Sequence, residues 1–338
     1  MKLLQNYPLQ DITTFHAQVF AKYYTVFSSA DFLRKTLSSP ELKGMPFIIL
    51  GGGSNVLFTG DFNGVIIRNA MDGMEVISQD ENNIYIKANG GEKWHDFVLY
   101  CVHRNYGGIE NLSLIPGTVG AGPIQNIGAY GVELKDVLFE VEAMNVHTLE
   151  IRKFTNAECK FGYRESIFKK EEKGNYIILS VTFKLNKNPK ANVSYGSLSK
   201  ELEAMGIINP TIKDVSNAVI KIRSSKLPDP DKLGNAGSFF KNPTIPNEQF
   251  EKLKIEHPNI VSFPATEGYT KLAAGWMIEQ CGWKGKRIGD AGVHKDQALV
   301  LVNYADATGK EIYNLSTQII DSVKEKFGVE LEREVNIF

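Results

Sequence analysis

The 338-residue sequence lacks long apolar runs, an excess of charge of either sign and any ordered cysteine pattern. Its longest apolar stretches, such as 47–50 and 298–302, are far shorter than the roughly 20 residues that span a bilayer. Lys and Arg number 38 against 39 Asp and Glu, so the broad positive field that attracts nucleic acid or anionic membrane is missing. The three cysteines are widely spaced, which is typical of reduced thiols and not of a disulfide framework. We therefore expect a soluble, cytoplasmic protein, a monomer that binds neither nucleic acid nor membrane.

Two common catalytic patterns are also missing. The six histidines show no metal-ligand spacing, so we predict no metal site. No Gly-x-Ser-x-Gly elbow is present, and nothing in the sequence therefore supports serine hydrolase chemistry.

Hydrophobic residues make up 43% of the chain, enough for a sizeable core, and the length predicts two or three domains. Apolar periodicity predicts alternating helices and strands and hence an α+β protein. The predicted helices are 30–37, 94–102, 215–222, 271–281 and 312–327, and the predicted strands are 47–50, 65–67, 84–88, 137–146, 176–183 and 298–302. The proline-rich stretch 227–231 is the best candidate for a linker.

A run of small residues, Gly51-Gly52-Gly53-Ser54-Asn55, follows a predicted strand. It lacks the Gly-Lys-Ser/Thr ending of a P-loop, and the third glycine of a dinucleotide fingerprint would fall at Val56. Its backbone N–H groups are compatible with an anion-binding nest. A plain tight turn is the alternative.

A second tract, from Pro116 to Gly131, holds five glycines and cannot form a regular helix. Glycine allows the backbone to approach a flat, polar-edged cofactor closely, although an irregular structural loop would look the same. Together the two tracts favour a dinucleotide-type cofactor.

Several segments, in matching order and spacing, resemble the UDP-N-acetylenolpyruvoylglucosamine reductases, flavoenzymes of bacterial peptidoglycan synthesis. Each segment alone is weak, whereas the set is specific and covers essentially the whole chain. The segments are Gly51 to Phe58, Ile115 to Gly131, Phe161-Gly162-Tyr163-Arg164-Glu165-Ser166, Asn235 to Pro243 and Leu331 to Val335. The stretch through Tyr195-Gly196 resembles the longer type I form, with a tyrosine loop over the substrate site.

The resemblance implies a vanillyl-alcohol-oxidase-type FAD-binding fold of two subdomains, residues 1–70 and 71–227, followed by an α/β UDP-sugar domain, residues 228–338. We expect the FAD to be non-covalent, since no histidine or cysteine lies within the second tract to attach the ring. Two departures are visible. Arg333 stands where proline is familiar, and family members can carry a longer tail, which leaves open how the segment after Glu334 packs.

The implied reaction takes hydride from NADPH through FAD to C3 of the enolpyruvyl group of the UDP-sugar. Arg164 would bind the carboxylate where negative charge develops, because guanidinium stays charged and offers two parallel donors. Glu334 would lie near the carboxylate or enolic oxygen, with a raised pKa, and Ser238 would protonate C2.

The resemblance also assigns two binding sets. The expected FAD contacts are Gly51, Gly52, Gly53, Ser54, Asn55, Pro123, Ile124, Gln125, Gly128, Ala129, Gly131 and Arg223. The expected substrate contacts are Tyr163, Tyr195, Lys226, Asn242, Lys284 and Gln297.

Two other functions remain open at this point. Another FAD oxidoreductase of the same fold would have no use for an acid at C2, which argues against it. A non-catalytic UDP-sugar-binding protein with degenerate flavin loops would purify without the yellow colour of flavin.

Overall fold

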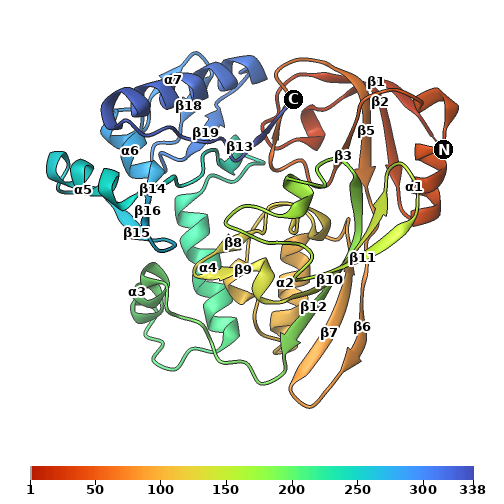
Figure 1. The fold of residues 1–338 in the computed structure, drawn as a ribbon, viewed down its shortest axis with the longest axis horizontal. Coiled ribbons are helices and arrows are strands. Elements are labelled where there is room, and N and C mark those ends of the chain that lie inside the picture. The colour runs from red at the N-terminus through yellow and green to blue at the C-terminus, as the bar shows by residue number, and fades with distance from the viewer. Residues whose placement is uncertain (1) are drawn as a thin grey trace. The chain divides into compact units, whose positions relative to one another are not determined.

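The computed structural model describes residues 2–338 as two compact units (Figure 1). The first unit comprises residues 2–7, 21–52 and 63–225. The second comprises residues 8–20, 53–62 and 226–338, so each unit is built from separated stretches of chain. Within residues 2–338 no helix is both long enough and apolar enough to span a membrane.

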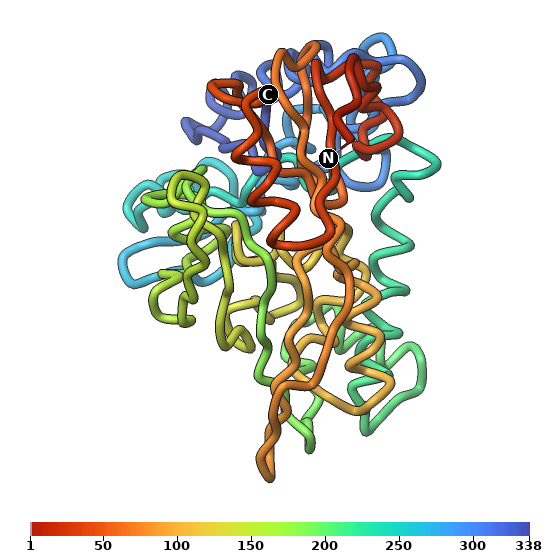
Figure 2. The backbone as a smooth tube through the Cα atoms, turned by 90° about the vertical axis from the view of Figure 1, so that its right-hand side faces the viewer, coloured from red at the N-terminus to blue at the C-terminus, as the bar shows by residue number. Residues whose placement is uncertain are grey.

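The first unit holds two main sheets. One has the strand order β1-β2-β5-β3, in which β3 and β5 run parallel, and the other has the antiparallel order β11-β10-β12-β7-β6. In Figure 2 the β6–β7 hairpin is the long orange loop at the lower end of the molecule. The strands are β1 (Leu4–Pro8), β2 (Phe20–Phe27), β3 (Phe47–Leu50), β5 (Phe62–Asn69), β6 (Met74–Gln79), β7 (Asn83–Asn89), β8 (Gly128–Ala129), β9 (Val132–Glu133), β10 (Leu138–Asn145), β11 (Ile151–Thr155) and β12 (Tyr176–Asn186).

The first two α-helices of this unit pack on the apolar faces of the sheets, and the last two pack against each other. In α2, Trp94 and Phe97 recur at helical spacing, and both are fully buried against Phe183 of β12. The α-helices are α1 (Ala30–Leu37), α2 (Trp94–His103), α3 (Gly196–Ala204) and α4 (Ile212–Lys226), and the 3₁₀ helices are Pro40–Leu42, Glu110–Leu112, Val119–Ala121, Leu134–Asp136 and Ile167–Lys169.

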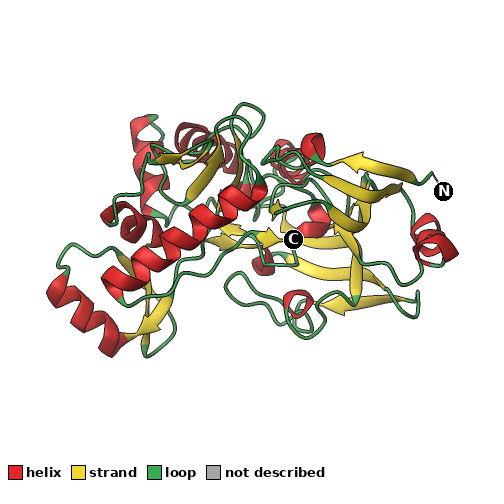
Figure 3. Cartoon of the chain, turned by 90° about the horizontal axis from the view of Figure 1, so that it is seen from above, coloured by secondary structure: helices red, strands yellow, loops and turns green. Residues whose placement is uncertain are grey.

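The second unit is built around a four-stranded antiparallel sheet of order β13-β19-β18-β17, packed against helix α7. At 19 residues, α7 is the longest helix of residues 2–338 (Figure 3). Thr308 caps it, accepting from the N–H of Glu311. The strands are β4 (Val56–Leu57), β13 (Gly234–Ser238), β14 (Thr244–Pro246), β15 (Ser262–Pro264), β16 (Tyr269–Leu272), β17 (Arg287–Ile288), β18 (Ala291–Val293), β19 (Val300–Asn303) and β20 (Asn336–Ile337), and the helices are α5 (Asn247–Glu256), α6 (Ala274–Gln280), α7 (Gly309–Phe327) and the 3₁₀ helix Gln10–Ile12.

The last strand of the second unit returns to a segment near the start of the chain. β20 pairs in parallel with β4, so that Asn336 lies opposite Val56. The N–H of Thr59 then donates to the carbonyl oxygen of Phe338, whose ring stacks on Phe58 at 5.3 Å. The segment after Glu334, whose packing the sequence left open, is thus part of the second unit.

Most of the predicted elements are confirmed. The helix at Ala30–Leu37, with Ser29 as its cap, has the expected bounds. The predicted helix 271–281 is too long, because Lys271 belongs to strand β16, where it pairs with Thr244, and the helix begins at Ala274. Helices α3 and α5 were not predicted from the sequence.

Candidate functional site

The two glycine tracts pack against each other within the first unit. Gly51 lies so close to Thr118 that an added Cβ would come 2.4 Å from its Oγ1. At Gly52 an added Cβ would approach Cα of Gly117 to 3.0 Å. Only glycine permits this approach, which leaves bare backbone amides and carbonyls along both tracts. Such a surface fits a flat cofactor with polar edges.

Arg164 lies in a tight turn beside the second tract. A bridge between Gly162 and Glu165 closes the turn, and Arg164 itself has the left-handed φ of +55°. Its Nη2 donates to the carbonyl oxygen of Gly128 at 2.8 Å. Positive φ in a non-glycine residue costs energy and is concentrated at functional sites. The turn therefore holds a guanidinium directly against the tract predicted to bind the flavin ring.

A half-buried cation lies close to the same tract. Arg223 of α4 donates through Nε to the carbonyl oxygen of Leu114 at 3.1 Å and hydrogen bonds to Tyr130. Burial lowers the pKa of Arg223 and raises that of Tyr130, and the interaction between the two opposes both shifts. The ring of Tyr130 meets that of Tyr195 edge-on at 5.5 Å. The structure thus connects the predicted FAD contact Arg223 with the predicted substrate contact Tyr195.

In the second unit, a β-bulge sets the position of Ser238. The register of β13 against β19 shifts between Asn235 and Ser238, and Gly237 within the bulge has a φ of +67°. The side chain of Asn235 accepts from the N–H of Gly237 at 2.9 Å and fixes the bulge. Bulges redirect side chains near active sites, and Ser238 is exposed here. Phe239 and Phe240, which follow it, are completely buried.

Glu334 is next to this segment. Its N–H donates to the carbonyl oxygen of Phe239 at 2.8 Å, and the N–H of Lys241 donates to the carbonyl oxygen of Glu332 at 2.9 Å. Residues 239–241 and 332–334 therefore run antiparallel, and the structure brings Ser238 and Glu334 together. Asn55, which also belongs to the second unit, donates through Nδ2 to the carbonyl oxygen of Glu334 at 3.3 Å.

Three of the predicted substrate contacts have partners within the second unit. Asn242 Oδ1 accepts the N–H of Ala274 at 3.0 Å, at the start of α6. Lys284 forms an ion pair with Glu279 at 3.0 Å. Gln297 Oε1 accepts the N–H of Leu299 at 3.5 Å.

The other predicted contacts lie at the end of helix α4, in the turn of Arg164 or in the two glycine tracts. In the first unit the ring of Tyr163 faces the Arg164 guanidinium at 5.5 Å, and the carbonyl oxygen of Ile124 accepts from Ser166 Oγ at 2.7 Å. Lys226 is the exposed last residue of α4. Pro123, Gln125, Ala129 and Gly131 lie in the second glycine tract, and Gly53 and Ser54 in the first run.

The sequence analysis missed two residues that organise the site in the first unit. Tyr130 connects Arg223 and Tyr195, as described above. Asn126 is fully buried, donating to the carbonyl oxygen of Gly162 and accepting from the N–H of Lys135. Its φ is +47°, a conformation that asparagine tolerates better than most residues, so an asparagine within the glycine tract is the one signal in the sequence that could have identified it.

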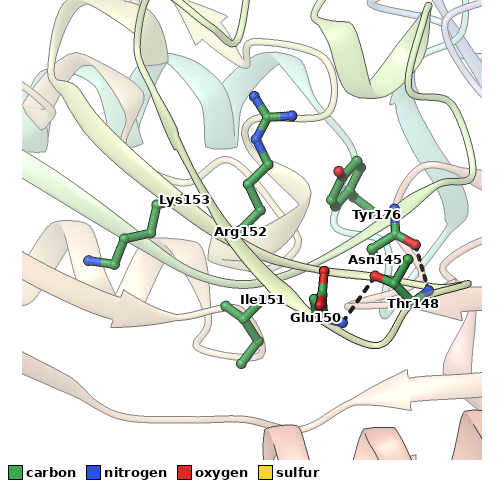
Figure 4. Close-up of a pocket in the computed structure, with 7 residues that line it drawn as sticks. All are labelled: Asn145, Thr148, Glu150, Ile151, Arg152, Lys153 and Tyr176. Carbon is green, nitrogen blue, oxygen red and sulfur yellow. Dashed lines mark hydrogen bonds between the residues drawn. The ribbon is translucent and has the colours of Figure 1, made fainter.

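A hollow on the surface of the first unit contains none of the predicted site residues. Its lining comes from β10, β11, the turn between them and the start of β12 (Figure 4). Arg152 and Lys153 form ion pairs with Glu158 and Glu140, respectively, so both cations are already neutralised. The hollow therefore has no evident part in the chemistry.

Two parts of the chain match known protein families. Residues 21–152 match the FAD binding domain family, and residues 229–338 match the family described as UDP-N-acetylenolpyruvoylglucosamine reductase, C-terminal domain. The bare glycine backbone fits the first match, and the protein is an FAD-dependent oxidoreductase.

Relatives that match along the full length show which family of FAD-dependent oxidoreductases this is. The chain is 50% identical to the UDP-N-acetylenolpyruvoylglucosamine reductase of Flavobacterium johnsoniae over 100% of both chains. It is 48% identical to that of Amoebophilus asiaticus, over 100% of this chain and 99% of the relative. The chain belongs to the UDP-N-acetylenolpyruvoylglucosamine reductase family.

A solved structure confirms the predicted fold. The UDP-N-acetylenolpyruvylglucosamine reductase from Thermus caldophilus superposes with a TM-score of 0.68 at 22% identity, covering 100% of this chain and 98% of the other. The α+β architecture with an FAD-binding portion followed by a C-terminal domain is therefore the one expected from the sequence.

Proposed function

We propose that this protein reduces the enolpyruvyl group of UDP-N-acetylenolpyruvoylglucosamine with NADPH, giving UDP-N-acetylmuramate for peptidoglycan synthesis. The observation that carries the proposal is the 50% identity to a reductase of this name along the whole chain. A role in the cell wall implies roles in cell shape and division, and we expect a cytoplasmic monomer.

Bound FAD would supply the hydride-transfer chemistry that connects NADPH with C3 of the substrate. The residues proposed to hold it are those of the run Gly51 to Asn55, those of the second tract from Pro123 to Gly131, and Arg223. The close packing of Gly51 and Gly52 on the second tract supports this assignment, because no side chain there stands between a cofactor and the backbone donors.

Arg164 is proposed to bind the substrate carboxylate as charge develops on it. A planar guanidinium forms two parallel hydrogen bonds to a carboxylate, and it stays charged throughout the pH range of the enzyme. One of its nitrogens is already oriented by the carbonyl oxygen of Gly128. Preorganised donors of this kind stabilise a transition state without further reorganisation.

Ser238 is proposed to give its hydroxyl proton to C2, while Glu334 lies near the carboxylate or enolic oxygen. Hydride at C3 and a proton at C2 together saturate the vinyl group, and the serine regains its proton from solvent. Serine is a weak acid, so the step depends on close placement beside a strongly basic carbon. The hydrogen bond from the Glu334 N–H to the Phe239 carbonyl oxygen supports a shared role for the two residues.

Six side chains are proposed to bind the rest of the substrate. Tyr195, which meets Tyr130 edge-on, would cover the diphosphate. The others are Tyr163, Lys226, Asn242, Lys284 and Gln297. Of these, Lys284 would have to exchange its ion pair with Glu279 for one with a phosphate. The division into subdomains 1–70 and 71–227 and a substrate domain 228–338 is part of the same proposal.

The test is NADPH oxidation under anaerobic conditions, with and without the enolpyruvyl UDP-sugar. We expect a yellow protein whose flavin NADPH bleaches once, and continuous turnover only when the sugar is present. Turnover with another acceptor but not with this sugar would indicate a different FAD oxidoreductase. A colourless protein that binds the sugar without turnover would indicate a binding protein. Acid precipitation should release the flavin, because the attachment is proposed to be non-covalent.

A further inference from the structure

Arg333, one residue before Glu334, has an unusual set of partners in the second unit. Its Nε donates to Ser316 Oγ at 2.7 Å, and its Nη2 donates to Thr317 Oγ1 at 2.6 Å. The guanidinium also lies over the ring of Tyr313, 4.4 Å from the centroid. All three partners are on helix α7, and within residues 2–338 none of the partners of this guanidinium is a carboxylate.

The two hydroxyl groups that accept these hydrogen bonds are oriented by helix α7 itself. Ser316 Oγ donates to the carbonyl oxygen of Tyr313 at 2.6 Å, and Thr317 Oγ1 donates to the same oxygen at 3.2 Å. Each hydroxyl therefore has its proton committed to the helix and turns a lone pair outward. Ser316 is fully buried, so its position is set by the core of the unit. The planar fork of Arg333 matches two such fixed acceptors, which the single ammonium of a lysine cannot do.

The segment that Arg333 anchors is the one that carries Glu334. Arg333 is bridged to Phe240 in antiparallel register, and the flanking hydrogen bond runs from the Glu334 N–H to the Phe239 carbonyl oxygen. Successive side chains of an extended segment point to opposite faces. With Arg333 committed to α7, the side chain of Glu334 is directed to the face away from that helix.

We propose that Arg333 is a positioning residue, which fixes the register and face of the Glu334 segment by clamping it to α7. The inference rests on the proposed role of Glu334 in the reaction of the substrate. The clamp has no contact with the substrate of its own, and its effect reaches the chemistry only through the placement of Glu334. Small displacements of a reacting group are costly, on the order of 100-fold for about 1 Å.

The first test measures the two half-reactions in Arg333→Ala by stopped flow. We expect bleaching of the flavin by NADPH within about twofold of the unmodified enzyme, and reoxidation by the enolpyruvyl sugar slowed by about tenfold. Arg333→Lys should recover only part of the rate. Ser316→Ala combined with Thr317→Val, which removes the acceptors and keeps the arginine, should reproduce the loss. Equal slowing of both half-reactions, or of neither, would overturn the proposal.

A double-mutant cycle with Glu334→Gln separates this inference from the proposed function. If Arg333 acts through Glu334, then Arg333→Ala should slow reoxidation little further once Glu334 is replaced. Effects that multiply independently would overturn the clamp but leave the role of Glu334 intact. A Glu334→Gln enzyme with unchanged reoxidation would overturn both.

A third readout does not depend on catalysis. In the holoenzyme, hydrogen exchange of the peptide covering residues 329–338 should be faster in Arg333→Ala, since a segment released from α7 breaks the hydrogen bond from the Glu334 N–H to the Phe239 carbonyl oxygen more often. Arg152→Ala is the matched control, because that arginine also stacks on an aromatic ring, Phe154, in the other unit. It should change neither this exchange nor the half-reactions. Unchanged exchange in Arg333→Ala would mean that α7 does not hold the segment.

Discussion

The two units hold their proposed catalytic side chains in different ways. Arg164 lies in a turn closed between residues 162 and 165, and its guanidinium donates to the carbonyl oxygen of Gly128. Ser238 and Glu334 are far apart in the chain and meet only because residues 239–241 pair with residues 332–334. One unit uses local backbone geometry, and the other uses long-range pairing.

This difference predicts which substitutions should disturb each of the proposed catalytic side chains. A local turn keeps its conformation when distant residues are replaced. The function of Arg164 should therefore be affected mainly by substitutions of Arg164 itself or of the second glycine tract. The pairing of Ser238 with Glu334 depends on a bulge, an arginine clamp and a hydrogen bond from Asn55. Substitutions remote from Ser238 should therefore affect its half-reaction.

The largest effect is expected at Ser238. Ser238→Ala should leave bleaching of the flavin by NADPH near the unmodified rate, because that step needs no proton from this serine. Reoxidation by the enolpyruvyl sugar should slow by roughly 10²–10⁴-fold, the usual contribution of a positioned proton donor. Stopped-flow absorbance of each half-reaction measures both, and Ser238→Cys should keep partial activity.

If both half-reactions slow equally in Ser238→Ala, the serine shapes the bulge and donates no proton. If neither slows, the proton comes from elsewhere, and Ser238 of the second unit is not the proton donor.

The next effect is expected at Arg164. Arg164→Lys keeps the charge but loses the planar fork, so kcat/KM for the enolpyruvyl sugar should fall by an amount equivalent to about 2–4 kcal/mol. The matched control is Arg104→Lys, because Arg104 also donates to a backbone carbonyl oxygen, that of Tyr100, but lies on an exposed surface. Full turnover in Arg164→Lys would show that this arginine is only a surface residue.

A smaller effect on stability is expected where the glycine tracts meet. Gly51→Ala places a Cβ 2.4 Å from Thr118 Oγ1 and should lower the free energy of unfolding of the apoprotein by about 1–3 kcal/mol. Adding Thr118→Ala should restore most of the loss, since the next contact at 3.5 Å is ordinary. Gly60→Ala, which meets nothing within 4 Å, is the control. Equal denaturation midpoints for Gly51→Ala and Gly60→Ala would contradict the close packing.

The smallest expected effect is on the pH dependence of stability. Burial lowers the pKa of His95 below its ordinary value of 6.5, with Arg223 acting in the same direction and Asp96 against it. The neutral ring also accepts the N–H of Leu114 through Nδ1 at 3.0 Å. The unfolded chain then binds more protons than the folded one below pH 6.5, so stability falls as the pH drops from 6.5 towards the lowered pKa.

In urea unfolding between pH 7.5 and 5.5, His95→Gln should therefore flatten the loss of stability, by at most about 1.4 kcal/mol per pH unit. An unchanged pH dependence in that variant would assign the loss to other groups.

The sequence correctly predicted those structural features that depend on a local pattern of residues. The helix at Ala30–Leu37 follows from a serine cap and apolar spacing, and the failure of the dinucleotide fingerprint at Val56 agrees with a strand there in place of a helix. The family motifs led to the right fold because they lie along the whole chain. The overlong helix at 271–281 shows the limit, since pairing with Thr244 and with Phe263 makes Lys271 part of a strand.

What the sequence could not predict is the set of long-range contacts that orders the site. Nothing local indicates that Asn55 hydrogen bonds to the Glu334 carbonyl oxygen, or that Arg333 finds two hydroxyls on α7. The meeting of Arg223 with Tyr130 likewise requires the fold of α4 against the loop. Register and burial decide these contacts, and both come from tertiary packing.

The discontinuous second unit has a consequence for how the protein is made. Strand β4 finds its partner β20 only after nearly the whole chain exists, because Asn55 and Glu334 are separated by 279 residues. At about 5–20 residues per second, the ribosome leaves the apolar segment Val56 to Phe58 without its partner for roughly 15–60 seconds. Throughout that time the segment is open to wrong pairing and to chaperones. Correct folding of this unit is therefore most sensitive during synthesis to temperature and to translation rate.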